Sequence, residues 1–357
     1  MERLPLYGYR ILDLTTAWAG PYATRLLADM GAEVIKVEAV NGGDLPRSAI
    51  FNHVNRNKYG CTLDLGQPRG RELFLRLAAL SDVVIEDHPQ VMEDLGLSQH
   101  VLRSARADII LVSLSSHGRS GPEKDFVANG SNIEELGGLT AISGYPGGGP
   151  QKTGVSYGEP VSGIAAAAAV ALALWHRRRT GEGQHVDVSQ WETMVGLIGE
   201  YVVGYSMNRR LPQPMGNRHS SMAPHGCYAC AGHDQWATIA VEDDEQFEAL
   251  CRVMGRPELA NDPRFADVVS RYRNQDELDS IVGEWTRELA PQAVTEALQA
   301  AGLPAGQAGA AAAPVLGAPA LFDDPHLRAR GFWETVSHPD AGTWDMDGVP
   351  WHLSRSP

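Results

Sequence analysis

Glu159 has the most informative surroundings of the residues in this chain that could do chemistry. It stands directly before Pro160 and an Ala-rich apolar stretch that runs to Trp175. This pattern predicts one helix, with Pro160 at its first position and Glu159 at or beside its N-cap. A helix N-terminus favours an ionised carboxylate by roughly 0.3–1 kcal/mol. Such a carboxylate can cap the helix or attack an acyl group as a covalent nucleophile. The residues alone leave both roles open and favour the cap.

Three other stretches could contact phosphates or nucleotides, and each also fits an ordinary structural role. The loop 55–58 (Asn-Arg-Asn-Lys) offers two cations and two amides, and it equally fits a solvated turn. The run 147–150 (Gly-Gly-Gly-Pro) lacks the Lys-Ser/Thr of a P-loop and fits an active-site flap or a linker. Residues 19–21 (Ala-Gly-Pro) follow a strand, and Glu38 ends the next strand. The G-x-G-x-x-G of a dinucleotide site is missing there, which argues against NAD.

The four cysteines give little support for a disulfide framework or a metal site. Four are too few for a framework in a chain of 357 residues. Cys227 and Cys230 form a C-x-x-C, but no second pair stands at zinc-finger spacing, and the flanking sequence resembles a strand. We interpret both as buried thiols, with metal or redox use as the less favoured alternative. We expect no metal site.

Composition argues against several classes of partner. A formal net charge of −14 disfavours nucleic-acid binding, which needs a basic face, although local cations and helix N-termini can still hold a small anion. The longest apolar stretch, 164–175, is shorter than the roughly 18 residues of a membrane span. The first residues, 1–5, lack the pattern of a signal peptide. We therefore expect a cytoplasmic protein without membrane contact.

The elements that must position these residues follow an alternating pattern over the first 115 residues. Apolar runs and helical spacing predict strands at 9–14, 32–38, 83–86 and 109–114, with helices at 22–30 and 70–80. Such alternation implies parallel strands joined by right-handed helical crossovers. The predicted fold class is therefore α/β, of the doubly wound kind.

The length suggests about two domains. A second block, with a strand at 235–241 and helices at 244–254, 275–289 and 291–300, has its own alternation. Polar or Ala/Gly/Pro-rich stretches flank it. The predicted organisation is a large domain from 1–205, a linker at 206–221, a small α/β domain at 222–304, a linker at 305–319 and a C-terminal part at 320–357.

Six stretches, taken in order, resemble the class III CoA-transferases, the family of formyl-CoA transferase and carnitine CoA-transferase. The stretch RRTGEGQHVDVS is the most specific of them, and the six together span nearly the whole chain. They are 19–38 (AGP and LLADMGAEVIKVE), 55–65 (NRNK and LDL), 82–97 (DVVIE and LGL), 118–122 (GRSGP), 178–189 (RRTGEGQHVDVS) and 324–339 (DPH, RGF and HP).

The resemblance implies a Rossmann-like large domain that the C-terminal part of the chain rejoins, a small domain inserted through two linkers, and an interlocked homodimer. It implies transfer of CoA from an acyl-CoA to a small carboxylate, with coenzyme A as substrate and no permanently bound cofactor. The family's nucleophile is an Asp before the Ala-rich helix, and Glu159 takes that position. The implied intermediates are an acyl-enzyme anhydride and an enzyme–CoA thioester.

The resemblance also suggests which residues contact the substrates. For CoA these are Lys36, Asn55, Arg56, Lys58, Gly118 and Gly121. For the acyl and acid groups they are Trp18, Ala19, Asn129, Gly148 and His225.

Besides Glu159, which replaces an Asp, three positions depart from the family pattern. Trp18 stands where formyl-CoA transferase has Gln, which argues against formate or oxalate as substrate, and Ala39 replaces an Arg of some members. Asn129 takes the place of a racemase His and cannot act as a base. The alternatives are another acyl-CoA reaction on the same fold (an epimerase, isomerase or lyase) and a non-catalytic acyl-CoA-binding protein.

Overall fold

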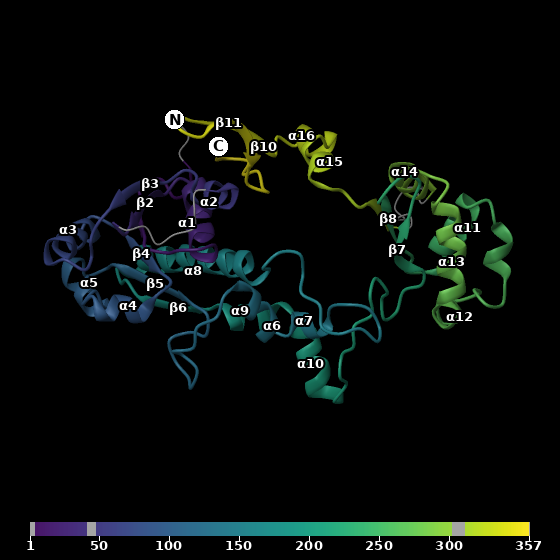
Figure 1. Cartoon of the computed structure of the whole chain (residues 1–357), viewed down its shortest axis with the longest axis horizontal. Coiled ribbons are helices and arrows are strands. Elements are labelled where there is room, and N and C mark those ends of the chain that lie inside the picture. The colour runs from purple at the N-terminus through teal and green to yellow at the C-terminus, as the bar shows by residue number, and fades with distance from the viewer. Residues whose placement is uncertain (1–3, 41–47, 302–310, 357) are drawn as a thin grey trace. The chain divides into compact units, whose positions relative to one another are not determined.

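The chain forms two units in the computed structural model (Figure 1), which describes residues 4–40, 48–301 and 311–356. Unit 1 comprises Met1–Ser143, Pro150–Gln213 and Phe332–Pro357, and unit 2 comprises Gly144–Gly149 and Pro214–Gly331. Unit 1 thus combines N-terminal and C-terminal parts of the chain. Compared with the expected boundaries, 206–213 lie with unit 1 and 320–331 lie with unit 2.

Unit 1 is built on a six-stranded parallel sheet, which confirms the predicted fold class. The strand order, β3-β2-β1-β4-β5-β6, is that of doubly wound nucleotide-binding sheets. In such sheets the order reverses beside the first strand, and ligands bind there, beyond the carboxyl ends of the strands. The strands are β1 (Arg10–Asp13), β2 (Glu33–Glu38), β3 (Tyr59–Thr62), β4 (Val83–Glu86), β5 (Ile110–Ser115) and β6 (His185–Ser189).

Helices of unit 1 cover both faces of this sheet. The helices of unit 1 are α1 (Ala19–Asp29), α2 (Ala49–Asn55), α3 (Pro68–Ala78), α4 (Pro89–Asp94), α5 (Gln99–Ala105), α6 (Gly130–Leu136), α7 (Leu139–Ile142), α8 (Gly158–Thr180), α9 (Gln190–Leu197) and α10 (Gly199–Asn208). Neighbouring strand residues point to opposite faces: Ile11 packs with α1 and α8, and Leu12 packs with α3, α4 and α5. Because both faces are covered, the strands read as continuous apolar runs.

The helix after Glu159 is longer than expected. α8 begins at Gly158, so Pro160 is its third residue rather than its first, a position where a missing N–H still costs nothing. Among the described residues, α8 is the one helix long and apolar enough to cross a membrane, contrary to the expected short stretch. A buried core helix meets the same criteria, and one face of α8 packs against α1 and the sheet.

A C-terminal hairpin completes unit 1. Its strands, β10 (Trp333–His338) and β11 (Gly342–Asp347), pair antiparallel. Asp347 at its end binds Arg25 of α1 at 2.9 Å and His53 of α2 at 3.0 Å. Although burial favours a neutral acid, His53 and the nearby guanidinium groups lower the pKa of Asp347 to about 2. The hairpin is therefore held on unit 1 by a charged contact.

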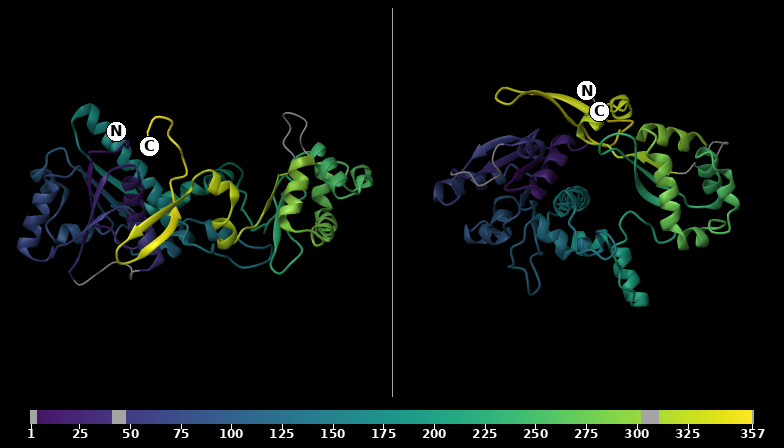
Figure 2. Two further views of the ribbon diagram at one scale, coloured as in Figure 1. Left: turned by 90° about the horizontal axis from the view of Figure 1, so that it is seen from above. Right: turned by 45° about the vertical axis from the view of Figure 1, so that its right-hand side comes forward.

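Unit 2 has a separate core on a three-stranded antiparallel sheet, with several of its helices covering one face (Figure 2). β9 lies within the segment 305–319 that was expected to be a linker, and residues 305–310 of that segment lie outside the described residues. The elements are β7 (His225–Ala229), β8 (Trp236–Ala240), β9 (Ala311–Pro314), α11 (Asp244–Val253), a 3-10 helix η1 (Pro257–Asn261), α12 (Val268–Arg273), α13 (Gln275–Thr286), α14 (Pro291–Ala301), α15 (Ala318–Phe322) and α16 (Pro325–Ala329).

Candidate active site

Three helices of unit 1 begin at the Glu159 carboxylate. Glu159 is the second residue of α8, and its Oε2 accepts a hydrogen bond of 2.9 Å from the backbone N–H of Ala19, the first residue of α1. The N–H of Gly130, the first residue of α6, also donates to it. First-turn N–H groups have no partner within their own helix, so they are free to hold an anion.

Burial and hydrogen bonds shift the pKa of Glu159 in opposite directions. Burial raises the pKa of its carboxyl above the usual 4.5, and the N–H groups of Ala19 and Gly130 oppose that rise. The side chain is half-buried. A partly desolvated carboxylate with a raised pKa is a stronger nucleophile than one in water, so the position suits covalent chemistry as well as capping.

Asn129 and Gly130 share one turn but have different roles. The Asn129 side chain caps α6, accepting from the N–H groups of Ser131 and Asn132. Gly130 packs so closely on Glu159 that a Cβ at 130 would lie 2.4 Å from Glu159 Cγ. The sequence reasoning selected Asn129 and missed Gly130, for which the glycine itself, at a helix start, was the only signal.

The first turn of α1 connects Glu159 to a cavity. Trp18 is the N-cap of α1, and its buried Nε1 has no acceptor among the described residues. Ala19 follows and donates to Glu159. Three residues earlier, Thr16 lines a cavity of about 380 Å³ at the carboxyl ends of β1, β2 and β4. The segment 16–19 therefore contacts this cavity at one end and Glu159 at the other.

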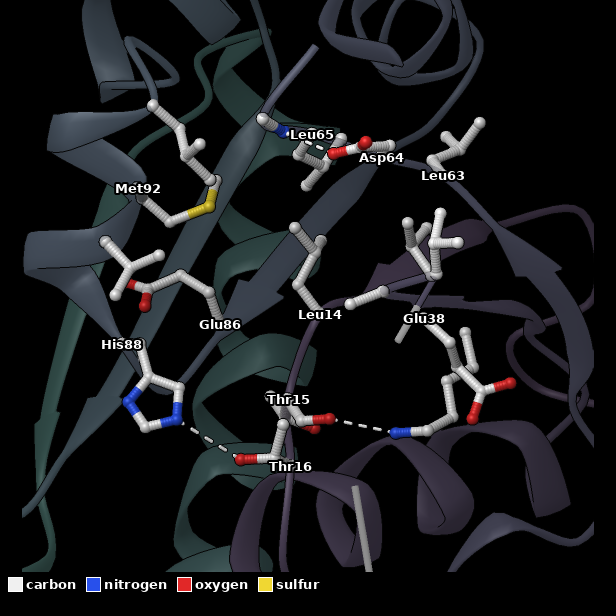
Figure 3. A pocket seen from close by; sticks show the side chains of 17 residues that line it. Leu14, Thr15, Thr16, Glu38, Leu63, Asp64, Leu65, Glu86, His88 and Met92 are labelled. Carbon is white, nitrogen blue, oxygen red and sulfur yellow. Dashed lines mark hydrogen bonds between the residues drawn. The ribbon is translucent and has the colours of Figure 1, made fainter. Parts of the chain in front are cut away.

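Figure 3 shows the polar groups of this cavity, where the Thr16 hydroxyl lies 3.2 Å from His88 Nε2. Burial, with the neighbouring charge of Asp87, raises the pKa of Glu86 to about 7. Residues that line the cavity include Leu14, Thr15, Thr16, Lys36, Glu38, Leu63, Asp64, Glu86, His88 and Met92. Apart from Lys36, none of these was predicted as a site residue, although Thr15, Thr16 and His88 are polar residues that follow strands.

Four of the predicted CoA contacts, Lys36, Asn55, Arg56 and Lys58, line two neighbouring cavities of unit 1. Lys36 is buried at the cavity, and its Nζ donates to the Thr15 carbonyl at 2.9 Å. Lys58 forms a buried ion pair of 2.9 Å with Asp13. Lys58 also donates to Asn55 Oδ1.

Arg56 lies near these residues, between Asp29 and Asp347, at 3.0 and 3.4 Å. Asn55, Arg56 and Lys58 line a second cavity, of about 720 Å³, which shares Lys36 and Glu38 with the first. Because Asn55, Arg56 and Lys58 already have partners within the chain, their role in CoA binding stays a prediction.

The loop after β5 contains Gly118 and Gly121, both with positive φ, at 80° and 92°. This conformation favours glycine and explains the GRSGP stretch without a ligand. Asp187 of β6 accepts from the N–H of Arg119 between them, which ties the loop to the sheet. Their predicted contact with CoA is therefore not needed to account for the glycines, and it stays a prediction.

Two predicted pocket residues, Gly148 and His225, belong to unit 2. His225 Nδ1 lies 2.7 Å from the Asn217 carbonyl, so this nitrogen carries the proton and donates. Cys227 of β7 and the following Cys230 are free thiols, and burial raises the pKa of each. Among the described residues, no three His, Cys, Asp or Glu side chains are grouped to hold a metal.

The family model described as CoA-transferase family III matches residues 6–357. The chain belongs to CoA-transferase family III. This confirms the predicted family and its enzyme class. Curated relatives of this family III chain are named as CoA-transferases. A succinyl-CoA–D-citramalate CoA-transferase of Chloroflexus aurantiacus is 34% identical, over 99% of this chain and 89% of the relative. A succinyl-CoA:mesaconate CoA-transferase of Haloarcula hispanica is 35% identical, over 93% and 85%.

Solved structures of similar sequence have the same fold as this chain. A CaiB/BaiF family protein from Brucella suis superposes with a TM-score of 0.88 at 30% identity, covering 100% of this chain and 94% of that one. A hypothetical protein from Mycobacterium tuberculosis gives 0.84 at 29% identity, covering 99% and 94%. The predicted Rossmann-like architecture is therefore that of the family.

Proposed function

We propose that this CoA-transferase moves CoA from an acyl-CoA to a carboxylic acid, with Glu159 as the covalent nucleophile. The observation that carries the proposal is the carboxylate itself. It is partly buried, held by the N–H groups of Ala19 and Gly130, and its pKa is raised by burial. Neighbouring Asn129 is engaged in capping α6 and cannot act as a base, which favours acyl transfer over α-proton chemistry.

The reaction balances without a co-reactant. Glu159 attacks the thioester carbonyl, forming an acyl–glutamyl anhydride and releasing CoA thiolate. The thiolate then attacks the Glu159 carbonyl, giving a glutamyl–CoA thioester and the free donor acid. The acceptor carboxylate attacks this thioester, and the released thiolate takes the new acyl group from the second anhydride, restoring Glu159. The Ala19 and Gly130 N–H groups are placed to stabilise negative charge that develops on the Glu159 oxygens.

We place the nucleotide end of CoA in the cavity at the carboxyl ends of β1, β2 and β4. It lies beside the switch point of the strand order, where doubly wound sheets bind nucleotides. Lys36 is the predicted cation that lines this cavity. Substituting Thr16 with Tyr would fill it and should raise KM for the acyl-CoA while leaving KM for the acid unchanged.

A homodimer is part of the proposal. The solvent face of α8 carries Ile164, Leu172 and Trp175, which are 53%, 66% and 58% exposed in the single chain. An apolar stripe of this kind on a surface helix normally has a partner. Two relatives are named as the alpha and beta subunits of a succinyl-CoA–L-malate CoA-transferase, which supports the assembly of chains of this family. The interlocked form implied by the resemblance remains the arrangement we propose.

A transfer assay tests the function. Succinyl-CoA, which the names of several relatives contain, is incubated with the protein and citramalate, mesaconate, glutarate or malate, and the new thioesters are identified by mass spectrometry. We expect transfer to at least one acid, and a loss of at least about 10³-fold in Glu159→Gln. Exchange of solvent deuterium into the α position without an acceptor acid would instead support an epimerase.

A further inference from the structure

Glu134 is a fully buried carboxylate one turn along α6 from Gly130. It makes three hydrogen bonds, all with the segment just before α8. Its Oε1 accepts from the N–H of Thr153 at 2.6 Å, and its Oε2 accepts from the Thr153 hydroxyl at 3.1 Å and from the N–H of Tyr157 at 3.3 Å. Tyr157 is the N-cap of α8, two residues before Glu159.

These bonds hold the segment 153–157, which leads into α8, against α6. α6 contacts Glu159 through the Gly130 N–H, and it holds the segment that leads into Glu159 through the Glu134 carboxylate. One rigid helix therefore fixes both the nucleophile and the start of the helix that carries it. The carboxyl group of Glu134 has two acceptor oxygens, so it accepts from the N–H groups of Thr153 and Tyr157 on separate oxygens, which an amide with one oxygen cannot do.

Glu134 offsets the cost of its own burial by accepting from the N–H groups of Thr153 and Tyr157. An apolar residue at 134 would leave both N–H groups without this acceptor. A buried acid is favoured where the segment must be held in one conformation, as before a nucleophile that loses about 10²-fold in rate when it shifts by 1 Å.

We propose that Glu134 is a positioning residue for the acyl-accepting carboxylate, acting through the segment 153–157. This inference rests on the proposed function of Glu159. Glu134 does not touch the substrate, and its removal lowers the rate of acyl transfer to Glu159 rather than the affinity for acyl-CoA.

The test compares Glu134→Ala, Glu134→Gln and the neighbouring exposed Glu135→Ala in the transfer assay. For Glu134→Ala we expect kcat to fall about 10²-fold, with KM within about threefold of wild type. Gln keeps one acceptor for Thr153 N–H and should recover part of the loss, which leaves kcat between about threefold and about tenfold below wild type. Glu135→Ala should behave as wild type. Single-turnover labelling of residue 159 by acyl-CoA should slow in parallel with kcat.

Two results would overturn the inference. The first is wild-type kcat in Glu134→Ala or in Glu134→Gln. The second is a loss that disappears when the assay is cooled well below the melting temperature of the variant, which would show a folding defect alone. If Glu134→Ala does not fold, Glu134→Gln decides the question. Glu159→Gln is run in parallel: wild-type transfer by that variant would remove the proposed function itself.

Discussion

Two opposing influences set the character of Glu159. Burial favours its neutral form, and the N–H groups of Ala19 and Gly130 favour its anion. Glutamate reaches both donors because residue 130 has no side chain: a Cβ there would lie 2.4 Å from Glu159 Cγ and 2.8 Å from its Oε1. Gly130 does not have a positive φ, so its backbone conformation does not require glycine. The close approach of Glu159 is what requires glycine at position 130.

Gly130→Ala should therefore displace the carboxylate from its donors. We expect a lower melting temperature and a fall in kcat of about 10²-fold, although alanine is the better helix former. The same substitution made in Glu159→Ala should cost less stability, because two of the three nearest atoms are then absent. Equal shifts in melting temperature in both backgrounds would show that the contact with Glu159 is not the cause.

The sequence pointed to Glu159, and the resemblance added Ala19 as a pocket residue, but neither indicated Gly130 or the hydrogen bonds that hold the carboxylate. A carboxylate before an apolar helix is visible as a local pattern, and the resemblance assigned its chemistry. Gly130 is 29 positions away and Ala19 is 140 away, and only the folded sheet brings their N–H groups to the carboxylate. Conversely, Lys58 and Arg56 read as phosphate ligands because a sequence does not show that Asp13 and Asp29 already pair with them.

At the scale of elements, the carboxyl ends of the strands collect the polar groups. The alternating pattern predicted β1, β2, β4 and β5 and the helices α1 and α3, because each is a continuous apolar run or an amphipathic stretch, and it missed the shorter helices α2, α4 and α5. It missed β3, a half-exposed edge strand of four residues, and the hairpin β10–β11. The apolar stretch that follows β6 is divided at Ile198 into two helices, α9 and α10. Short, exposed elements carry little periodicity to detect.

Glu86, at the end of β4, makes stability depend on pH. Burial raises its pKa from 4.5 to about 7, so the folded chain holds a proton that the unfolded chain has lost. Stability should therefore fall as pH rises from about 4.5 to about 7 and then level off. Glu86→Gln removes this term and should stabilise the protein by on the order of 2 kcal/mol more at pH 8 than at pH 5. Denaturant unfolding at both pH values measures the difference.

The exposed Glu135→Gln is the matched control for this measurement and should change stability equally at both pH values. If the stabilities of Glu86→Gln and wild type differ by the same amount at pH 5 and pH 8, the Glu86 carboxyl does not titrate as described.

At the scale of the whole molecule, the α8 stripe predicts the assembly. Light scattering should give twice the 38.5 kDa mass of the chain. Trp175→Glu should shift the mass toward that of one chain, because it places a charge in the buried part of an apolar contact. Leu80→Glu, on an equally exposed residue after α3, should leave the mass unchanged. A wild-type protein that is monomeric at micromolar concentration would contradict the proposal.

The most direct test of the account is the covalent state of residue 159. The protein is incubated with succinyl-CoA without an acceptor acid, quenched in acid, digested and analysed by mass spectrometry. We predict a CoA thioester on the peptide that contains Glu159, which disappears when an acceptor acid is added and is absent in Glu159→Gln. Transfer at the wild-type rate by Glu159→Gln, or a CoA adduct that forms on another residue and turns over, would contradict the central claim.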